Sequence, residues 1–258
     1  MKVRLTRPPD SFDEAGVPCY STDQDKGLFE NQDHVLLEKA MEDGYSWVVK
    51  SHLFGFVRSS ARRLHFEGGL SIVELGGGDG SLFETLKPYA KLYFNVDPGA
   101  CRDKASVHQD ASYARIRCSA EDVPLPDGCA DLAVSVAALD HVPDYRRAID
   151  EAKRLLKPGG TFLVVLNNRR SWWKALLSRT AYLKRREMMI ARAHYFQWSP
   201  EDGERELRRK FSDVQVSSTT FVPYIARIGK HLLGPANSLG SLLMPRRGAN
   251  LLMTCTRD

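Results

Sequence analysis

The sequence lacks several features that would assign it to a specialised class of protein. Its five cysteines, at positions 19, 101, 118, 129 and 255, are scattered and form no CxxC pair. This spacing predicts neither a zinc site nor a disulfide framework, and it favours the reducing cytoplasm. The charge-free stretch 232–245 is broken by glycine and proline, and it is shorter than the roughly 20 apolar residues that span a bilayer. The polar residues 1–30 contain no apolar segment typical of a signal peptide.

Charge of one sign is not in large excess either. The chain has 37 Lys and Arg against 32 Asp and Glu, which gives a net charge of +5. That excess is small for a nucleic-acid-binding domain, and the sequence contains no recognisable nucleic-acid module, so a nucleic-acid partner is not expected. Of the 258 residues, 43% are hydrophobic, which excludes a disordered chain and predicts a single folded domain over 1–258.

Short apolar runs alternate with helical patterns from residue 70 onward. Because these runs are continuously apolar, they predict strands that are buried on both faces. Their alternation with helices predicts a parallel, doubly wound α/β sheet. The expected strands are 70–75, 92–96, 113–119, 131–137, 161–166, 214–221 and 250–256, and the expected helices among them are 81–86, 145–156 and 200–210.

The pattern divides the chain into four parts. Residues 1–69 predict a loop followed by two helices within 31–64, and residues 70–168 form the core. Residues 169–199 predict a basic helical insertion. Residues 200–258 supply the last strands, with a loop rich in Gly, Pro and Leu between residues 221 and 250.

The strongest local signal is the glycine-rich turn 76–80, which follows the first expected strand. Glycines between a strand and a helix let the backbone turn tightly and approach a ligand without a Cβ clash. Asp97 ends the next strand, where a carboxylate can accept hydrogen bonds from both hydroxyls of a ribose. A turn-capping role for Asp97 before Pro98 is the alternative.

The spacing of the glycines separates two cofactor classes. The dinucleotide pattern GxGxxG fails from each possible start within 76–80. The run fits ExGxGxG instead, with its acid at Glu74, and this pattern resembles motif I of the class I S-adenosylmethionine-dependent methyltransferases. Segments 119–131, 137–144 and 151–164 resemble three further motifs of that family, in the family's order. The resemblance is closest to the subgroup that methylates small metabolites, lipids and quinone-like molecules.

This resemblance implies a Rossmann-like fold of about seven mostly parallel strands, the last one antiparallel. The cofactor would be S-adenosyl-L-methionine and the product S-adenosyl-L-homocysteine. Matched motif by motif, the cofactor would contact Glu74, Gly76, Gly77, Gly78, Gly80, Asp97, Pro98, Ser119, Ala120, Glu121 and Ala137. Two positions depart from the family's pattern, since Ser119 stands where Asp is frequent and Asp140 where the subgroup commonly has His.

Candidates for the acceptor side follow the fourth expected strand or lie in the insertion. His141 is the favoured general base, with Asp140 beside it, because a hydroxyl acceptor benefits from a group that takes its proton. Packing of His141 in its loop is the alternative. The dispersed histidines predict no metal site. Substrate contacts are expected from Tyr20, Trp172, Trp173, His194 and Tyr195.

The basic insertion indicates an anionic or lipid-like partner. Residues 169–192 carry eight Lys or Arg and a single acid, Glu187. Such a segment is either a solvated lid or a surface for an anionic molecule, and it predicts peripheral contact with the inner membrane face through 169–192 and 232–247. The expected function is methyl transfer to a small-molecule or lipid-like acceptor. A non-catalytic cofactor-binding scaffold and an NAD(P)-dependent oxidoreductase are the alternatives, and the sequence indicates no oligomeric state.

Overall fold

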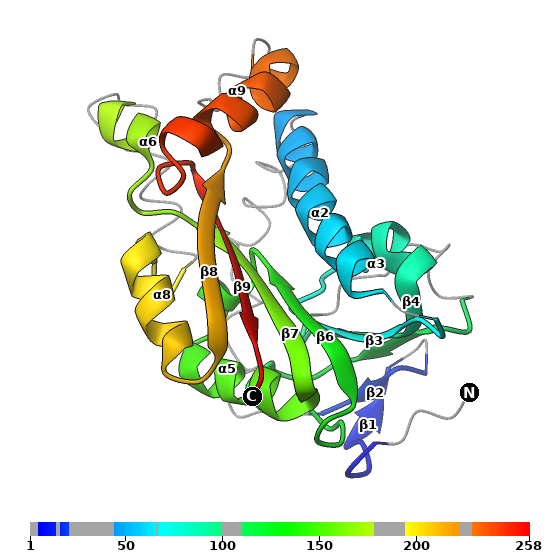
Figure 1. Cartoon of the computed structure of the whole chain (residues 1–258). Coiled ribbons are helices and arrows are strands. Elements are labelled where there is room, and N and C mark those ends of the chain that lie inside the picture. Colours follow the sequence, from blue (N-terminus) through cyan, green and yellow to red (C-terminus); the bar gives the residue numbers. More distant parts are fainter. Residues whose placement is uncertain are drawn as a thin grey trace.

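A seven-stranded sheet forms the centre of the molecule (Figure 1). The computed structural model describes residues 5–13, 16–20, 44–65, 67–99, 110–177, 194–221 and 229–258, with the backbone alone at 44–48, 177 and 229–233. In spatial order, the strands of the sheet are β5 (Tyr113–Ile116), β4 (Ala90–Val96), β3 (Leu70–Leu75), β6 (Ala130–Val136), β7 (Leu156–Asn167), β9 (Asn250–Thr256) and β8 (Ser212–Thr219).

The strand directions match a Rossmann-like fold. Neighbours from β5 through β7 run parallel, whereas β9 runs antiparallel to β7 on one side and to β8 on the other. This confirms the expected seven strands with the last one antiparallel. Because β3, β4, β5, β6 and β7 are parallel, their carboxyl ends meet at one edge of the sheet, where ligands of such folds bind.

Helices cover both faces of the sheet. Helices α2 (Gly44–Leu64) and α3 (Ser81–Leu86) pack on one face, and α5 (Tyr145–Leu155) and α8 (Pro200–Arg208) pack on the other. Alternate residues of a strand enter the two cores: in β3, Ile72 packs with α2 and α3, and Val73 packs with α5. Leu163 and Val164 of β7 alternate in the same way. This double burial explains why the strands are continuously apolar.

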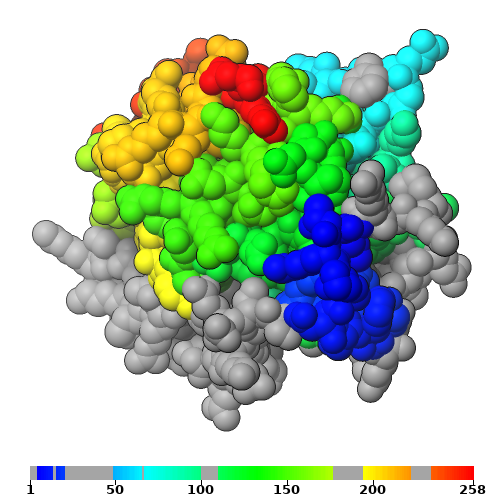
Figure 2. Space-filling view, turned by 90° about the horizontal axis from the view of Figure 1, so that it is seen from below, coloured from blue at the N-terminus to red at the C-terminus, as the bar shows by residue number. Residues whose placement is uncertain are grey.

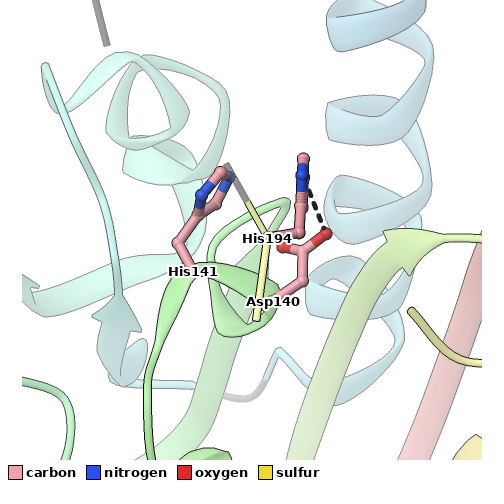
Figure 3. A group of neighbouring side chains, drawn as sticks. All are labelled: Asp140, His141 and His194. Atoms are coloured by element: carbon pink, nitrogen blue, oxygen red, sulfur yellow. Dashed lines mark ion pairs between the residues drawn. The ribbon is translucent and has the colours of Figure 1, made fainter. Parts of the chain in front are cut away.

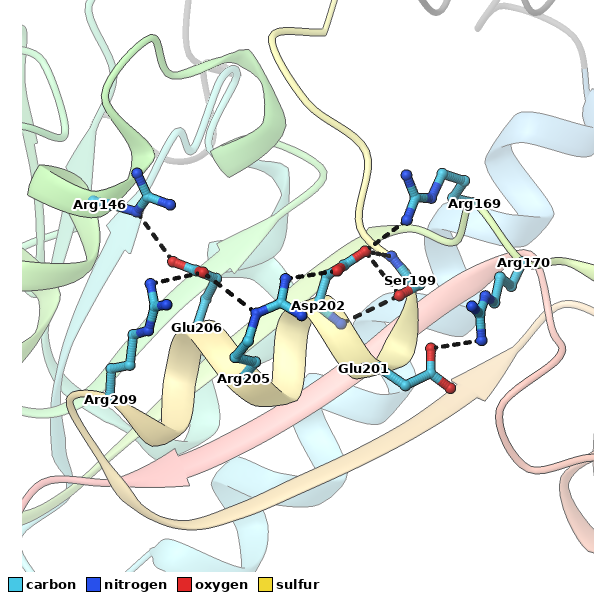
Figure 4. A network of polar contacts seen from close by, with 9 residues as sticks. All are labelled: Arg146, Arg169, Arg170, Ser199, Glu201, Asp202, Arg205, Glu206 and Arg209. Atoms are coloured by element: carbon cyan, nitrogen blue, oxygen red, sulfur yellow. Dashed lines mark hydrogen bonds and ion pairs between the residues drawn. The ribbon is translucent and has the colours of Figure 1, made fainter.

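A capping box starts α8 and holds the chain on either side of the insertion (Figure 4). The Ser199 hydroxyl accepts from the Asp202 N–H at 3.2 Å, and the Asp202 carboxylate accepts from the Ser199 N–H at 3.0 Å. Asp202 also pairs at 2.8 Å with Arg169, which follows β7. Further along α8, Glu206 pairs at 3.1 Å with Arg146 of α5. These contacts attach α8 to both neighbouring segments of the core.

The N-terminal segment lies beside β5. Strands β1 (Ser11–Phe12) and β2 (Pro18–Cys19) pair with each other, and Cys19 forms a parallel bridge with Arg117, just after β5. Figure 2 shows this segment, in blue, against the green residues of the core. The N-terminal segment therefore covers the chain that leaves the carboxyl end of β5.

The second helix predicted within 31–64 is confirmed as α2, and the first of the two predicted helices lies outside the described residues. One region differs from the sequence-based prediction. The predicted loop between 221 and 250 contains a helix, α9 (Gly229–Leu243). Its buried residues Asn237 and Gly240 face the end of β8, and this packing outweighs the low helix propensity of its Gly and Pro residues.

The insertion is described at its two ends. It begins with α6 (Trp172–Leu177), and most of the expected basic helix, 178–193, lies outside the described residues. Short 3-10 helices occur at Lys87–Tyr89 and Leu139–His141. Among the helices that the structure describes, we find none with the length and apolar character needed to cross a membrane.

Candidate functional site

The turn after β3 can be built only from glycine at its first position. Gly76, Gly78 and Gly80 have φ angles of 80°, 51° and 72°, in the left-handed region that favours glycine. The Gly76 N–H donates to the Val96 carbonyl at 2.7 Å, and a Cβ on Gly76 would collide with the Ala138 side chain. The turn therefore packs between the end of β4 and the loop that follows β6.

Neighbouring positions of this turn have opposite surroundings. A Cβ on Gly77 would collide with the Asn95 side chain and would lie 2.7 Å from Glu74 Oε2. A Cβ on Gly78 would meet no atom within 4 Å. Gly77 therefore packs against the protein, whereas Gly78 presents bare backbone to open space, as a loop that holds a ligand closely requires. This open side of the turn fits a cofactor.

Asp97 joins the glycine turn to the loop after β4. Its Oδ2 accepts from the Gly78 N–H at 2.9 Å, and its Oδ1 accepts from the Gly99 N–H at 2.8 Å. Asp97 and Pro98 are partly exposed. Each carboxylate oxygen has a second lone pair, so this arrangement leaves acceptor capacity for two ribose hydroxyls. The structure thus gives Asp97 the predicted turn-capping contacts and is compatible with ribose binding.

Arg115 of β5 holds the same two loops from beneath, and the sequence-based prediction missed it. Its guanidinium is buried and donates to the carbonyls of Gly78 at 2.8 Å and Gly99 at 3.1 Å. Asn95 also donates to the Gly78 carbonyl, at 3.4 Å. A lone Arg in a short, weakly apolar strand has no sequence signal, since its role depends on two loops that are distant in the chain.

Glu74 supports the turn from inside the core. It is buried and accepts a hydrogen bond from the Tyr93 hydroxyl. Burial raises the pKa of Glu74 to about 7, although the Tyr93 hydrogen bond and the Lys50 charge act in the opposite direction. Glu74 is therefore a structural carboxyl group beneath the turn, and its burial favours the protonated form.

The segment after β5 places Ser119, Ala120 and Glu121 together in a buried turn. The Ser119 hydroxyl donates to Glu121 Oε2 at 3.0 Å, and Glu121 Oε1 accepts from the Asp144 N–H at 2.7 Å. Glu121 thus connects this turn to the start of α5. The Ser119 hydroxyl therefore holds Glu121. The resemblance implies a different role for the Asp that is frequent at this position, namely a contact with the adenine.

The loop after β6 is strained at Ala137. Its φ angle is 52°, which is rare for a residue with a Cβ, and its N–H donates to the Val165 carbonyl at 2.8 Å. Strained residues of this kind cluster at functional sites. The left-handed conformation of Ala137 redirects the chain from β6 toward the 3-10 helix that carries Asp140 and His141.

Asp140, His141 and His194 form a cluster at the carboxyl end of the sheet (Figure 3). His194 Nε2 lies 3.1 Å from Asp140 Oδ2, and Asn167, at the end of β7, lies 3.4 Å from both groups. The His141 and His194 rings stand side by side with their centres 4.3 Å apart. The sequence-based prediction placed His194 among substrate contacts, and its pairing with Asp140 was missed because 53 residues separate them.

Asp140 is a buried charge. Burial raises the pKa of its carboxyl, but hydrogen bonds from His194 and Asn167 and the charges of both histidines outweigh it, so the pKa lies below its ordinary value. Among the described residues, Asp140 Oδ1 has no hydrogen-bond partner. The donor atoms of the three side chains lie within 4.8 Å of one another, which corrects the expectation of dispersed histidines: they could hold a metal ion.

Other predicted substrate contacts are distributed differently. Tyr20 and Trp173 are buried, and they donate to the carbonyls of Arg7 and Thr220. The structure thus shows packing contacts for both, and their contact with substrate stays a prediction. Trp172 is half-exposed at the start of α6. Tyr195 is exposed, and its N–H donates to the Asp140 carbonyl at 2.9 Å, which places it beside the cluster.

Comparison with known proteins agrees with this geometry. A family model described as a methyltransferase domain matches residues 73–164. A Mycolicibacterium smegmatis protein named "Probable S-adenosylmethionine-dependent methyltransferase" is 31% identical over 112 residues, 42% of each chain. A ubiquinone biosynthesis O-methyltransferase of Bradyrhizobium diazoefficiens is 29% identical over 132 residues, 47% of this chain and 51% of that protein. The chain thus matches about half the length of these relatives or less.

A solved structure extends the likeness of the fold beyond that segment. A SAM-dependent methyltransferase of Thermotoga maritima superposes with a TM-score of 0.60, covering 90% of this chain and all of that one, at 22% identity. The common fold therefore extends well beyond the segment that the family model matches.

Proposed function

We propose, from the premise that residues 73–164 belong to the class I S-adenosylmethionine-dependent methyltransferase family, that the chain moves a methyl group from S-adenosyl-L-methionine to a small-molecule or lipid-like acceptor. The observation that carries this proposal is the open glycine turn bonded to Asp97: bare backbone at Gly78, with the Asp97 carboxylate 2.9 Å from its N–H. A turn of this kind fits the methionine part and the ribose of one nucleoside cofactor.

The residues around the turn would bind and orient the cofactor. Backbone groups of 76–80 would contact its amino acid part, Asp97 its ribose, and the turn 119–121 its adenine. Arg115 would keep the two loops at a fixed separation through its bonds to Gly78 and Gly99. When bound, S-adenosyl-L-methionine supplies a methyl group on a positively charged sulfur, which a nucleophile can displace in line.

The cluster in Figure 3 would serve the acceptor. We assign the general base to His194, with Asp140 as its orienting carboxylate, because His194 is the imidazole that Asp140 contacts at 3.1 Å. As an acceptor hydroxyl forms its bond to carbon, His194 would take the hydroxyl proton and Asp140 would stabilise the resulting imidazolium. His141, the base favoured by the sequence, would line the same space beside the His194 ring.

Two features support a hydroxyl on an apolar molecule as the acceptor. A base held by a buried carboxylate suits oxygen, whose proton must be removed during transfer, better than sulfur. The relative from Bradyrhizobium diazoefficiens is named as an O-methyltransferase of ubiquinone biosynthesis. Two further proposals, each from the sequence alone, are a cytoplasmic location and an anionic group on the acceptor.

Calorimetry with three ligands tests the proposal first. We expect S-adenosyl-L-methionine and S-adenosyl-L-homocysteine to bind with micromolar affinity and NADPH not to bind. Binding of NADPH alone would overturn the assignment in favour of an oxidoreductase. Transfer of a labelled methyl group to phenolic and lipid-like hydroxyl acceptors then separates an enzyme from a scaffold, because a scaffold binds the cofactor without turnover.

A further inference from the structure

We infer that the outer surface of α6 and α9 docks on an anionic lipid bilayer and brings the acceptor end of the sheet to the membrane. We call this surface the leucine face; it consists of Trp172, Leu176, Leu239, Leu242, Leu243 and Met244. The inference rests on the proposed function in one respect, namely that the acceptor is lipid-like.

The leucine face contains most of the large apolar side chains that the described structure exposes. Leu242 is 78% exposed, Leu176 70% and Leu243 66%. In the described part of the chain, the other strongly exposed large apolar side chains are Phe12 and Tyr195. Single exposed leucines are ordinary on a protein surface, but a group of them on two helices marks an interaction site.

Packing on the inner side of α9 fixes the leucines outward. Asn237 is buried, and its Oδ1 accepts from the N–H groups of Thr220 at 2.8 Å and Phe221 at 3.1 Å. One turn later, a Cβ on Gly240 would collide with the Phe221 ring, so the helix lies directly against that ring. With this side held against the end of β8, Leu242 and Leu243 face away from the protein.

Hydrogen bonds join the start of α6 to the segments on either side of α9. The Trp172 N–H donates to the Arg247 carbonyl at 2.9 Å, and its indole N–H donates to the Phe221 carbonyl at 3.1 Å. The Asn168 amide donates to the Arg246 carbonyl at 3.1 Å. The start of α6 is therefore bonded to the segment that follows α9, and Figure 1 shows both helices at the same end of the molecule.

That end of the molecule is the acceptor end. Strand β7 leads into α6, and its last residue, Asn167, contacts both Asp140 and His194. The leucine face thus begins a few residues beyond the proposed catalytic cluster. A molecule that enters from a membrane in contact with this face would reach the cluster without crossing the core.

Charge around the leucine face favours anionic lipid. The sequence contains no Asp or Glu from 214 to 257, and 169–192 has eight cations against Glu187. Arg246 and Arg247 follow Met244 and are exposed, although Arg246 pairs with Glu204 at 2.8 Å. Anionic headgroups attract cations at a membrane surface, and tryptophan prefers the interface. The two stretches of sequence that contain the leucine face, 169–192 and 214–257, therefore carry more net positive charge than the chain as a whole.

Vesicle flotation tests the inference with the whole chain. The probes are vesicles of phosphatidylcholine alone and vesicles of phosphatidylcholine mixed with phosphatidylglycerol. Leu242→Ser combined with Leu243→Ser removes apolar side chains, and Arg247→Glu reverses one charge. Phe12→Ser is the matched control, because Phe12 is 65% exposed on β1, at the opposite end of the molecule.

We expect the wild type to float with the anionic vesicles and to lose binding in high salt. The double leucine variant should bind at least about tenfold more weakly, since each leucine contributes on the order of a kcal/mol when it enters the interface. Arg247→Glu should weaken binding to anionic vesicles several-fold, and Phe12→Ser should bind as the wild type does. Affinity for S-adenosyl-L-homocysteine, measured by calorimetry, should be equal in all four proteins and shows that each is folded.

Several results would overturn the inference. They are no flotation of the wild type, equal binding to both kinds of vesicle, and equal losses in Phe12→Ser and the leucine variant. A wild type that dimerises through this face, so that the leucine variant becomes monomeric while neither binds vesicles, would assign the face to a second copy instead. If the wild type did not bind S-adenosyl-L-homocysteine but did bind anionic vesicles, the proposed function would be contradicted and the membrane docking would not.

Discussion

The glycine turn after β3 and the leucine face on α6 and α9 lie at the same end of the sheet but are built in opposite ways. In the turn, backbone groups are bonded within the chain, and a single added carbon at Gly76 or Gly77 would collide with a neighbour. On the leucine face, large apolar side chains stand in solvent. The turn is therefore held in shape by contacts within the chain. Among the described residues, the leucine face has no such contacts on its outer side, and we infer that a membrane covers it.

The glycine turn lies inside the segment that the family model matches, and the leucine face lies outside it. The matched segment, 73–164, contains the turn, Asp97 and the Asp140 loop, but it ends before Asn167, His194 and both helices of the leucine face. The part proposed to bind the cofactor is therefore largely the part that these relatives have in common with this chain. The proposed acceptor cluster is only partly inside the match, since Asp140 and His141 belong to it and His194 does not, so likeness to relatives leaves the acceptor open.

The largest effect we expect separates catalysis from cofactor binding. His194→Ala should lower kcat by about 10²–10⁴, the usual contribution of a general base, and should leave the affinity for S-adenosyl-L-methionine unchanged. Steady-state methyl transfer and calorimetry measure the two quantities. Added imidazole should restore part of the rate, whereas His65→Ala, an exposed histidine before β3, should behave as wild type. If His194→Ala lost cofactor affinity to the same extent as kcat, His194 would support cofactor binding and would not act as the base alone.

Removal of metal sharpens the same prediction. An imidazole base needs no ion, so dialysis against EDTA should leave the rate unchanged. Activity that disappears with EDTA and returns with a divalent cation would make Asp140, His141 and His194 a metal site instead of an acid–base group.

A second prediction concerns the interior support of the turn. Glu74 has its pKa raised from 4.5 to about 7 in the folded protein, so the unfolded chain loses this proton first as the pH rises. The free energy of unfolding should therefore fall by about 3 kcal/mol from this group between pH 4.5 and pH 8. Glu74→Gln should abolish that part of the pH dependence, measured by urea unfolding at both pH values. The same slope in both proteins would show that Glu74 is not the group responsible.

The third prediction tests the exposed side of the turn. Asp97→Ala should weaken binding of S-adenosyl-L-methionine by about 1.5–3 kcal/mol, the scale of hydrogen bonds to a charged group. It removes the acceptor of the Gly78 N–H as well as that of the ribose. Asp97→Asn keeps one oxygen and should lose less. Calorimetry on both variants decides this, and wild-type affinity in Asp97→Ala would refute the ribose assignment.

The smallest effects should appear at α8 (Figure 4). Ser199→Ala removes a buried helix cap and should lower the free energy of unfolding by about 1 kcal/mol. Arg170→Ala breaks an exposed ion pair with Glu201, 3.1 Å long, and should cost less, about 0–1 kcal/mol. Chemical unfolding of both variants measures the difference. A larger loss in Arg170→Ala would reverse our ranking of cap over surface pair.

Local signals account for what the sequence could predict. The strands of the sheet have continuous apolar runs because both faces are covered, and the glycine turn is required by local backbone geometry. Asp97 could be found because it follows a strand at a fixed place in the motif. Each of these features depends on residues close together in the chain, so a sequence pattern is enough to identify it.

Contacts between distant segments account for what was missed. The pairing of Asp140 with His194 and the hold of Arg115 on two loops exist only once the sheet has formed. The run of glycine, proline and leucine in 229–243 is typical of a loop, and tertiary packing makes it α9. Trp172 and Trp173 look alike in sequence, but a helix points neighbours in different directions, so one is 36% exposed and the other 1%.

The position of β9 has a consequence for how the protein is made. In the described sheet β8 pairs with β9 alone, yet β9 is synthesised after β8 and sits between it and β7. On the ribosome, β8 emerges before β9 has been synthesised, so it has no strand to pair with until β9 is translated. Non-local pairing of this kind is slow and leaves sheet edges open to other chains. The vulnerable moment in this protein's synthesis therefore falls between the emergence of residue 219 and that of residue 256.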